Sequence, residues 1–238
     1  MDIIAKMESI RIVPVLVLND LKEGLQVCEQ LCRCGLPAAE ITFRTAAAED
    51  VIREASKEFP EMFIGAGTVL NVKDLHRAFD AGAKFAVAPG FNPTVVKEAM
   101  ANNFTFAPGV CTPSECEQAM ELGCKFLKFF PAEAAGGIPF LKSLAAPYKH
   151  LGVRFMPTGG VKPSNAAEYL AIPEIACVGG TWLNKTDDDT IIHSRSTVQL
   201  GAQRGGQLAG ALEIQTGQGI LQLGHLQQLG HGAVGTQQ

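Results

Sequence analysis

Short apolar runs alternate with helical stretches along the chain as far as residue 183. The runs rich in β-branched and aromatic residues predict eight strands, at 12–18, 38–44, 63–69, 84–89, 104–110, 125–130, 154–157 and 175–178. Between the strands, Asp20, Asn92 and Thr112 stand where a helix cap is expected, the last two directly before a proline. The strands are almost continuously apolar, which is typical of a parallel sheet covered by helices.

Eight successive strand-then-helix units predict an α/β fold, a single TIM (β/α)8 barrel with an additional helix at the N-terminus. The length of 238 residues is common for one such barrel. A doubly wound open sheet is the alternative, but no G-x-G-x-x-G sequence follows the first strand. We expect the barrel domain to occupy residues 1–183.

The segment 184–238 has a different composition. It contains no Phe, Trp or Tyr and is rich in Gly and Gln. Glycine at this density opposes a helix, so we expect the eighth helix to be missing and residues 184–238 to be disordered or weakly structured. A change of reading frame near the 3′ end of the coding sequence would produce such a tail, which is a hypothesis.

Composition and charge narrow the classes of partner. Hydrophobic residues make up 47% of the chain, and the net charge is −4. A negative chain is a poor match for nucleic acid or an anionic membrane. No apolar run reaches the roughly 18–20 residues of a membrane span, and no signal peptide is recognisable, so we expect a cytoplasmic protein. Seven cysteines without a C-x-x-C pair suit a reducing compartment, and five scattered histidines predict no metal site.

The second strand has one polar face. Because alternate residues of a strand point to opposite sides, Glu40, Thr42 and Arg44 share a face while Ala39 and Ile41 share the other. The apolar face must meet the helices, so the polar one lines the barrel interior. A buried carboxylate is costly unless it is paired, and either Arg44 or a lysine of another strand could be its partner. An ion pair that only fixes the interior is the alternative interpretation.

The sixth strand places a lysine inside the barrel. Lys128 shares its face with Phe126 and Phe130, whereas Leu127 faces the helices. Desolvation between aromatic rings disfavours the ammonium form and favours the neutral amine, which a Schiff-base nucleophile requires. The alternative is a lysine that only forms an ion pair with Glu40.

Glycine-containing turns are predicted at the ends of three strands. Gly65–Thr68 ends the third strand, Thr158-Gly159-Gly160 ends the seventh and Gly179-Gly180-Thr181 ends the eighth. Barrels keep their active sites at the carboxyl ends of the strands, and the last two loops commonly bind phosphate through backbone N–H groups. The pattern therefore predicts an anionic, phosphorylated small-molecule ligand.

Five segments of the chain together resemble one family of enzymes. They read EITFRT at 40–45, GAGTVL at 65–70, KFFPA at 128–132, PTGG at 157–160 and GGTWL at 179–183. In this order they are similar to the class I aldolases that cleave 2-keto-3-deoxy-6-phosphogluconate (KDPG) and 4-hydroxy-2-oxoglutarate (KHG). The resemblance covers about residues 5–183.

The resemblance implies a homotrimeric, cofactor-free lyase that releases pyruvate together with glyceraldehyde 3-phosphate or glyoxylate. It implies that Lys128 forms the Schiff base and that Glu40 is the general acid and base. Arg44 and Thr68 would hold the carboxylate and hydroxyls of the keto acid. The remaining implied substrate-binding residues line the pocket or hold a distal phosphate: Pro89, Phe130, Thr158, Gly159, Gly160, Gly179, Gly180 and Thr181.

The sequence leaves the choice between KDPG and KHG open, because the glycine turns favour the phosphorylated substrate but the family often uses both. A phosphate-binding barrel isomerase or epimerase is one alternative, since such barrels share the late glycine turns. A non-catalytic sugar-phosphate sensor on an aldolase scaffold is the other, suggested by the unusual tail.

Overall fold

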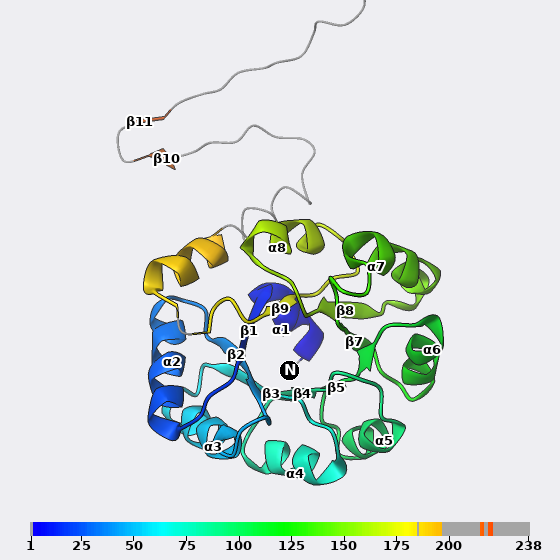
Figure 1. Cartoon of the computed structure of the whole chain (residues 1–238), viewed down its shortest axis with the longest axis horizontal. Helices are drawn as coiled ribbons and strands as arrows, with labels where there is room; N and C mark the ends of the chain where they lie inside the picture. The colour runs from blue at the N-terminus through cyan, green and yellow to red at the C-terminus, as the bar shows by residue number, and fades with distance from the viewer. Residues whose placement is uncertain (1, 185, 197–214, 217–218, 221–238) are drawn as a thin grey trace, which may run out of the picture.

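The computed structural model describes residues 2–184, 186–196, 215–216 and 219–220. Figure 1 shows short strands in the middle of the molecule and helices around them, with α1 lying across the centre. The strands that run from the N-terminus to residue 180 are β1 (Ile12–Leu16), β2 (Ala38–Thr42), β3 (Phe63–Gly67), β4 (Phe85–Val87), β5 (Phe106–Ala107), β6 (Gly109–Val110), β7 (Phe126–Phe129), β8 (Arg154–Pro157) and β9 (Val178–Gly180).

The helices alternate with these strands. Their bounds are α1 (Ile3–Ile10), α2 (Leu21–Arg33), α3 (Ala48–Glu58), α4 (Val72–Asp80), α5 (Pro93–Ala101), α6 (Pro113–Glu121), α7 (Gly137–Ala145) with the 3-10 helix η1 (Ala146–Leu151), and α8 (Pro163–Leu170). A short antiparallel pair, β10 (Gln215–Thr216) and β11 (Gly219–Ile220), stands further along the chain.

All strand pairs up to β9 are parallel. One sheet has the order β5-β4-β3-β2-β1-β9, and a second has the order β6-β7-β8. β5 and β6 are two parts of the strand predicted at 104–110, interrupted at Pro108. Parallel bridges from Phe155 to Ile175 and from Thr158 to Gly179 join the second sheet to the β9 segment. The predicted α/β class with a parallel sheet is therefore confirmed.

The predicted helix starts are formed by local caps. The Asp20 carboxylate accepts a hydrogen bond from the N–H of Glu23, and the Asn92 side chain accepts one from Thr94. Thr112 and Glu115 form a reciprocal capping box at the start of α6. Each cap satisfies backbone N–H groups that have no partner inside the helix.

The strands carry one apolar cluster on each of their two faces. Ile41 and Leu127 belong to the larger cluster, between strands and helices. Phe85 and Phe126 belong to the inner cluster, where Met7 of α1 packs against them. The strand parity read from the sequence thus assigns the faces correctly, and α1 closes one end of the interior.

The prediction for the eighth strand needs correction. The sequence placed the strand at 175–178 and a turn at Gly179-Gly180, but both glycines lie in β9. A Cβ at Gly179 would collide with the hydroxyl of Thr158, and one at Gly180 would collide with the indole ring of Trp182. These glycines therefore permit close packing of a strand rather than a turn.

The prediction of a weakly structured tail from Asn184 is wrong for residues 186–196. Residues 188–196 are helical, the side chain of Asp187 accepts a hydrogen bond from the N–H of Thr190, and Ile191 is buried. The Gln30 amide of α2 donates to the carbonyl of Thr186 at 2.9 Å. The glycine-rich composition begins only at Gly201, so an average over 184–238 concealed a helix-compatible start. Residues 197–214, 217–218 and 221–238 lie outside the described residues.

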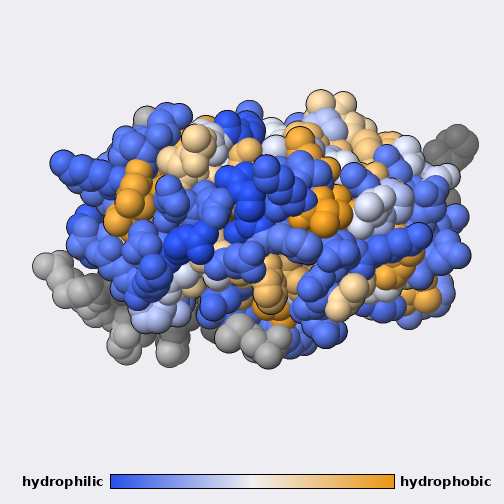
Figure 2. All heavy atoms as spheres, turned by 90° about the horizontal axis from the view of Figure 1, so that it is seen from below, coloured by the Kyte–Doolittle hydropathy of each residue, from blue (hydrophilic) through white to orange (hydrophobic). Residues whose placement is uncertain are grey.

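The surface in Figure 2 is mostly hydrophilic, with apolar areas set between polar ones. Among the described residues, none of the helices is long and apolar enough to cross a membrane.

Candidate active site

Lys128 and Glu40 meet inside the ring of strands. The Lys128 Nζ lies 3.0 Å from Glu40 Oε1 and 3.3 Å from Oε2. Both residues are buried, with 5% and 1% of their surface exposed. The Nζ also lies 5.8 Å from the centre of the Phe130 ring. Of the two partners that the sequence left open for Glu40, the structure thus selects the lysine.

Gly67 makes room for the Glu40 carboxylate. Gly67 pairs with Thr42 across β3 and β2. A Cβ at this position would overlap Glu40 Oε1 and lie 2.7 Å from its Cγ. Sequence reasoning treated the segment Gly65–Thr68 as a strand-end turn and missed this role. The sequence signal that could have indicated this role was a glycine in a strand next to the strand that carries a buried glutamate.

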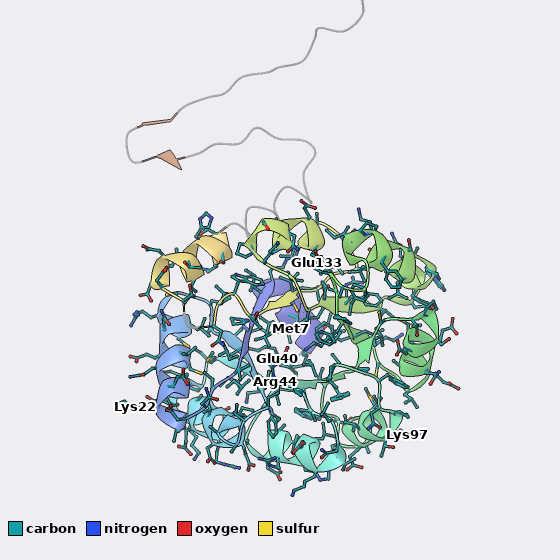
Figure 3. All side chains as sticks on the ribbon, viewed as in Figure 1. Met7, Lys22, Glu40, Arg44, Lys97 and Glu133 are labelled. Atoms are coloured by element: carbon teal, nitrogen blue, oxygen red, sulfur yellow. The ribbon has the colours of Figure 1, made fainter. Side chains whose placement is uncertain are left out.

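Thr42 connects Arg44 to β1. Its hydroxyl donates to the carbonyl of Leu16 at 2.9 Å and accepts a hydrogen bond from Arg44 Nε at 3.3 Å. Arg44 forms no ion pair with any residue that the structure describes. Its remaining N–H groups can therefore bind a carboxylate. Figure 3 shows Glu40 and Arg44 close together near the centre of the ring.

Glu40 and Lys128 both line a cavity of about 160 Å3. It gathers nearly all of the residues that the sequence predicted for the site: Glu40, Arg44, Thr68, Pro89, Lys128, Phe130, Thr158, Gly159, Gly160, Gly180 and Thr181. Gly179 does not line it. Val15, Thr42 and Val161 do line it, and the sequence analysis had not assigned them to substrate binding. The parity of the first strand could have identified Val15, which lies opposite Glu40.

The loop after β8 forms a tight rim over the cavity. Gly159 and Gly160 have φ angles of 96° and 84°, a region that favours glycine. A Cβ at Gly159 would lie 3.1 Å from the Phe130 ring. The buried Thr158 hydroxyl has no hydrogen-bond partner among the described residues. A buried polar atom without a partner is unfavourable, so this hydroxyl is a candidate contact for a bound ligand.

The arrangement has the parts of an amine-based reaction. A lysine amine can attack a carbonyl group, and a carboxylate at hydrogen-bond distance can carry protons to and from the reacting atoms. The Arg44 guanidinium and the glycine rim also line the cavity. Among the described residues, no cluster of His, Cys, Asp and Glu is suited to hold a metal ion.

Comparison with known proteins gives a consistent result. Residues 3–194 match the family model described as "Aldolase: KDPG and KHG aldolase". The match thus extends into the helical residues 188–196.

Two relatives cover most of the chain. The 2-dehydro-3-deoxy-phosphogluconate aldolase of Haemophilus influenzae is 44% identical over 180 residues, which are 76% of this chain and 84% of the relative. The KHG/KDPG aldolase of Escherichia coli K12 is 42% identical over 176 residues, 74% of this chain and 82% of the relative.

Solved structures of similar proteins share the fold. The 2-keto-3-deoxy-6-phosphogluconate aldolase of Zymomonas mobilis ZM4 with 3-phosphoglycerate superposes with a TM-score of 0.75 at 39% identity, covering 82% of this chain and 94% of the other. The KDPG aldolase of Legionella pneumophila, with pyruvate captured as a covalent carbinolamine, has a TM-score of 0.72 at 34% identity, covering 84% and 97%.

Proposed function

This chain belongs to the KDPG and KHG aldolase family, and we propose that it is a class I aldolase that cleaves KDPG to pyruvate and glyceraldehyde 3-phosphate. Aldolases are lyases, so the chain is an enzyme of that class. The observation that carries the proposal is the buried Lys128 amine, 3.0 Å from the Glu40 carboxylate at the floor of the cavity. KHG, which would give pyruvate and glyoxylate, is proposed as a second substrate.

The reaction begins with the attack of the Lys128 amine on the ketone carbon of the substrate. Glu40, which has taken a proton from the Lys128 ammonium and so freed the amine for attack, protonates the hydroxyl of the resulting carbinolamine, which leaves as water, and a protonated imine forms. Glu40 then removes the proton of the C4 hydroxyl. The C3–C4 bond breaks, its electron pair moves into the imine to form an enamine, and the aldehyde departs. Protonation of the enamine at C3 and hydrolysis of the imine release pyruvate and restore the amine.

The other cavity residues bind the substrate in this proposal. Arg44 forms a bidentate pair with the keto-acid carboxylate, supported by Thr42. Thr68 contacts the hydroxyl groups. The rim at Gly159 and Gly160 receives the distal phosphate through backbone N–H groups, which approach an anion closely because no side chains intervene.

A closed barrel and an oligomer complete the proposal. We count β5 and β6 as one strand, so that the parallel strands up to β9 form a (β/α)8 barrel, with the helical residues 188–196 in the place of the eighth helix. The protein is proposed to be a homotrimer, which light scattering coupled to size-exclusion chromatography would test. It is proposed to act in the cytoplasm, a location compatible with its seven free cysteines.

Reductive trapping tests the chemistry directly. The protein is incubated with pyruvate and borohydride, digested, and mapped by mass spectrometry. We expect a reduced pyruvyl adduct on Lys128 and none after Lys128→Met. Lys125→Met is the matched control, because this exposed lysine of the same segment bonds to the carbonyl of Leu151 and not to Glu40. Folded protein without an adduct would exclude the Schiff base and favour an isomerase or a ligand sensor.

A further inference from the structure

Glu133 and Tyr169 form a hydrogen bond beside the glycine rim. The Tyr169 hydroxyl donates to Glu133 Oε1 at 2.5 Å. Tyr169 belongs to α8 and is fully buried, whereas Glu133 lies in the loop between β7 and α7. Burial and the contact with Glu133 raise the pKa of the Tyr169 phenol, so it remains a hydrogen-bond donor at neutral pH.

The rim lies between the two elements that this hydrogen bond connects. The N–H of Glu133 donates to the carbonyl of Gly159 at 2.9 Å, and that of Ala132 donates to Thr158 at 2.8 Å. The Glu133 side chain fills the space beside Gly160, where a Cβ would lie 2.6 Å from its Cβ and Cγ. The loop after β7 therefore supports the rim from one side.

α8 supports the rim from the other side, because this helix begins at Pro163, three residues after Gly160. Tyr169 thus fixes the position of Glu133 relative to the helix that follows the rim. Neither residue lines the cavity. In the view of Figure 3, Glu133 lies beside α8, away from Glu40 and Arg44.

The hydrogen bond also controls where a negative charge stands. A carboxylate free to turn toward the rim would repel a phosphate bound there, since like charges at close range are unfavourable. The phenol holds Glu133 Oε1 beside Gly137, where an added Cβ would lie 3.2 Å from this oxygen. The same contact thus shapes the rim and keeps the carboxylate directed away from it.

We propose that Glu133 is a positioning residue that acts with Tyr169 to hold the rim Thr158–Gly160 ready for a distal phosphate. Together they set the preference for phosphorylated over unphosphorylated 2-keto acids. The inference rests on the proposed aldolase function and concerns neither the Schiff base nor the proton transfers at Glu40.

Three variants test the role of the pair. Tyr169→Phe keeps the buried ring and removes the hydroxyl, Glu133→Ala removes the carboxylate, and Glu133→Gln keeps a hydrogen-bond acceptor without the charge. We expect Tyr169→Phe and Glu133→Ala to lower kcat/KM for KDPG by about tenfold or more, mainly through KM, because a hydrogen bond to a charged group is lost. The value for KHG should change less than about twofold, and Glu133→Gln should retain most of the wild-type preference.

Tyr148→Phe is the matched control. The Tyr148 hydroxyl also bonds to a carboxylate, Glu117 at 3.1 Å, but η1 and α6 hold this pair outside the site. Tyr148→Phe should leave the ratio of kcat/KM for KDPG to kcat/KM for KHG unchanged. Glu133 is exposed, so Glu133→Ala is the variant with the smallest risk of unfolding.

One result would overturn the role of Glu133: an unchanged ratio of kcat/KM for KDPG to kcat/KM for KHG in Tyr169→Phe and Glu133→Ala, whether both values fall equally or neither falls. Pyruvate trapping on Lys128 separates this failure from that of the proposed function. Trapping should proceed at the wild-type rate in all three variants. Its absence from the wild type would overturn the aldolase function and this inference together.

Discussion

The side chains of Glu40 and Lys128 belong to residues 88 positions apart in the chain and meet at 3.0 Å inside the ring of strands. Burying two charges costs several kcal/mol for each ion, and an apolar pair of similar volume is often at least as stable. The pair is therefore a poor device for stability alone, and its place at the cavity floor fits a chemical role.

Variants of Glu40 and Lys128 should distinguish effects on activity from effects on stability. We expect Glu40→Gln to lower kcat by about 10²–10⁴-fold, because the amide cannot carry a proton. Lys128→Met should abolish turnover and lower stability by about 3–5 kcal/mol, since it leaves Glu40 buried without a partner. The double variant should recover stability but not activity, as measured by urea denaturation and pyruvate release. Recovery of activity would instead support an ion pair that only fixes the interior.

Gly67→Ala should disturb Glu40 without removing it. The added methyl group would overlap the carboxylate. We expect kcat/KM to fall by about 10²-fold while the protein stays folded, because a displacement of about 1 Å can have this effect. Gly90→Ala is the control, since a Cβ at Gly90 meets nothing within 4 Å. Full activity of Gly67→Ala would show that the site tolerates a displaced carboxylate.

Thr42→Val should weaken binding of the keto-acid carboxylate. The change removes the oxygen that accepts the hydrogen bond from Arg44 Nε. We expect KM to rise by about tenfold with a smaller effect on kcat, as for the loss of one hydrogen bond to a charged group. Thr45→Val is the control, because its hydroxyl donates to the carbonyl of Leu18 and does not contact Arg44. Equal effects of the two variants would argue against the role of Thr42.

Ile191→Ala should destabilise the protein by about 2–4 kcal/mol, the usual cost of a cavity at a buried isoleucine. Ile192→Ala should change stability by less than about 0.5 kcal/mol, because the neighbouring side chain is 46% exposed. Thermal or urea denaturation measures both. Two equally small effects would support the sequence prediction that this segment is loosely packed.

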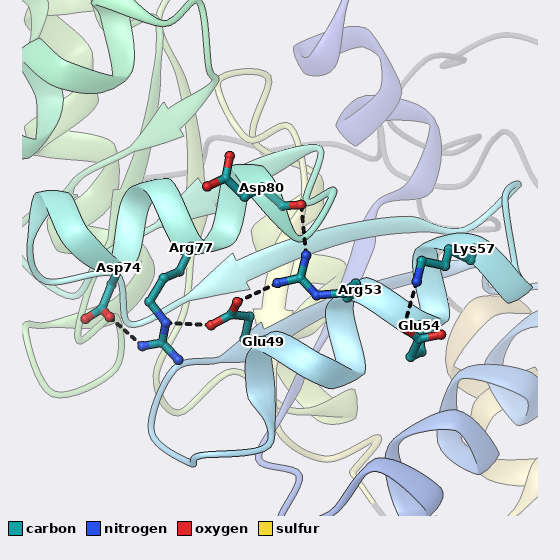
Figure 4. A network of polar contacts seen from close by, with 7 residues as sticks. All are labelled: Glu49, Arg53, Glu54, Lys57, Asp74, Arg77 and Asp80. Atoms are coloured by element: carbon teal, nitrogen blue, oxygen red, sulfur yellow. Dashed lines mark hydrogen bonds and ion pairs between the residues drawn. The ribbon is translucent and has the colours of Figure 1, made fainter.

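Glu49 should make stability depend on pH. Figure 4 shows its carboxylate between Arg77 and Arg53, with the Arg77 Nε at 2.6 Å. The hydrogen bond from Arg77 is the main reason why the pKa of Glu49 is lowered. A lowered folded-state pKa contributes stability above the unfolded value of about 4.3, and this contribution is lost as pH falls through the folded value.

Glu49→Gln should therefore destabilise the protein at pH 7 and have a smaller effect near pH 3. We expect about 0.5–1 kcal/mol at pH 7, because these groups are partly exposed and solvent screens them. Glu54→Gln is the control, since Glu54 pairs with the exposed Lys57 on the same helix. A loss that is equal at both pH values would indicate that packing, and not charge, is responsible.

The sequence alone determined the features that depend on neighbouring residues. A strand turns alternate side chains to opposite faces, so Lys128 and Leu127 could be assigned without coordinates. The caps at Asp20 and Thr112 act within three residues, and both helix starts agree with the structure. The site residues could be grouped because parallel strands end at one edge, although a family resemblance was needed to give them roles.

Which distant groups meet depends on the three-dimensional fold. It paired Glu40 with Lys128, placed Gly67 beside that carboxylate and connected Glu133 to Tyr169. It also placed the helical residues 188–196 against α2, where the Gln30 amide donates to the carbonyl of Thr186 and to Asp188 Oδ1. Local propensity amounts to less than about 1 kcal/mol per residue, whereas burial of one large apolar side chain contributes about 1.5–3 kcal/mol. Contacts between residues far apart in the chain therefore decide what local sequence leaves open.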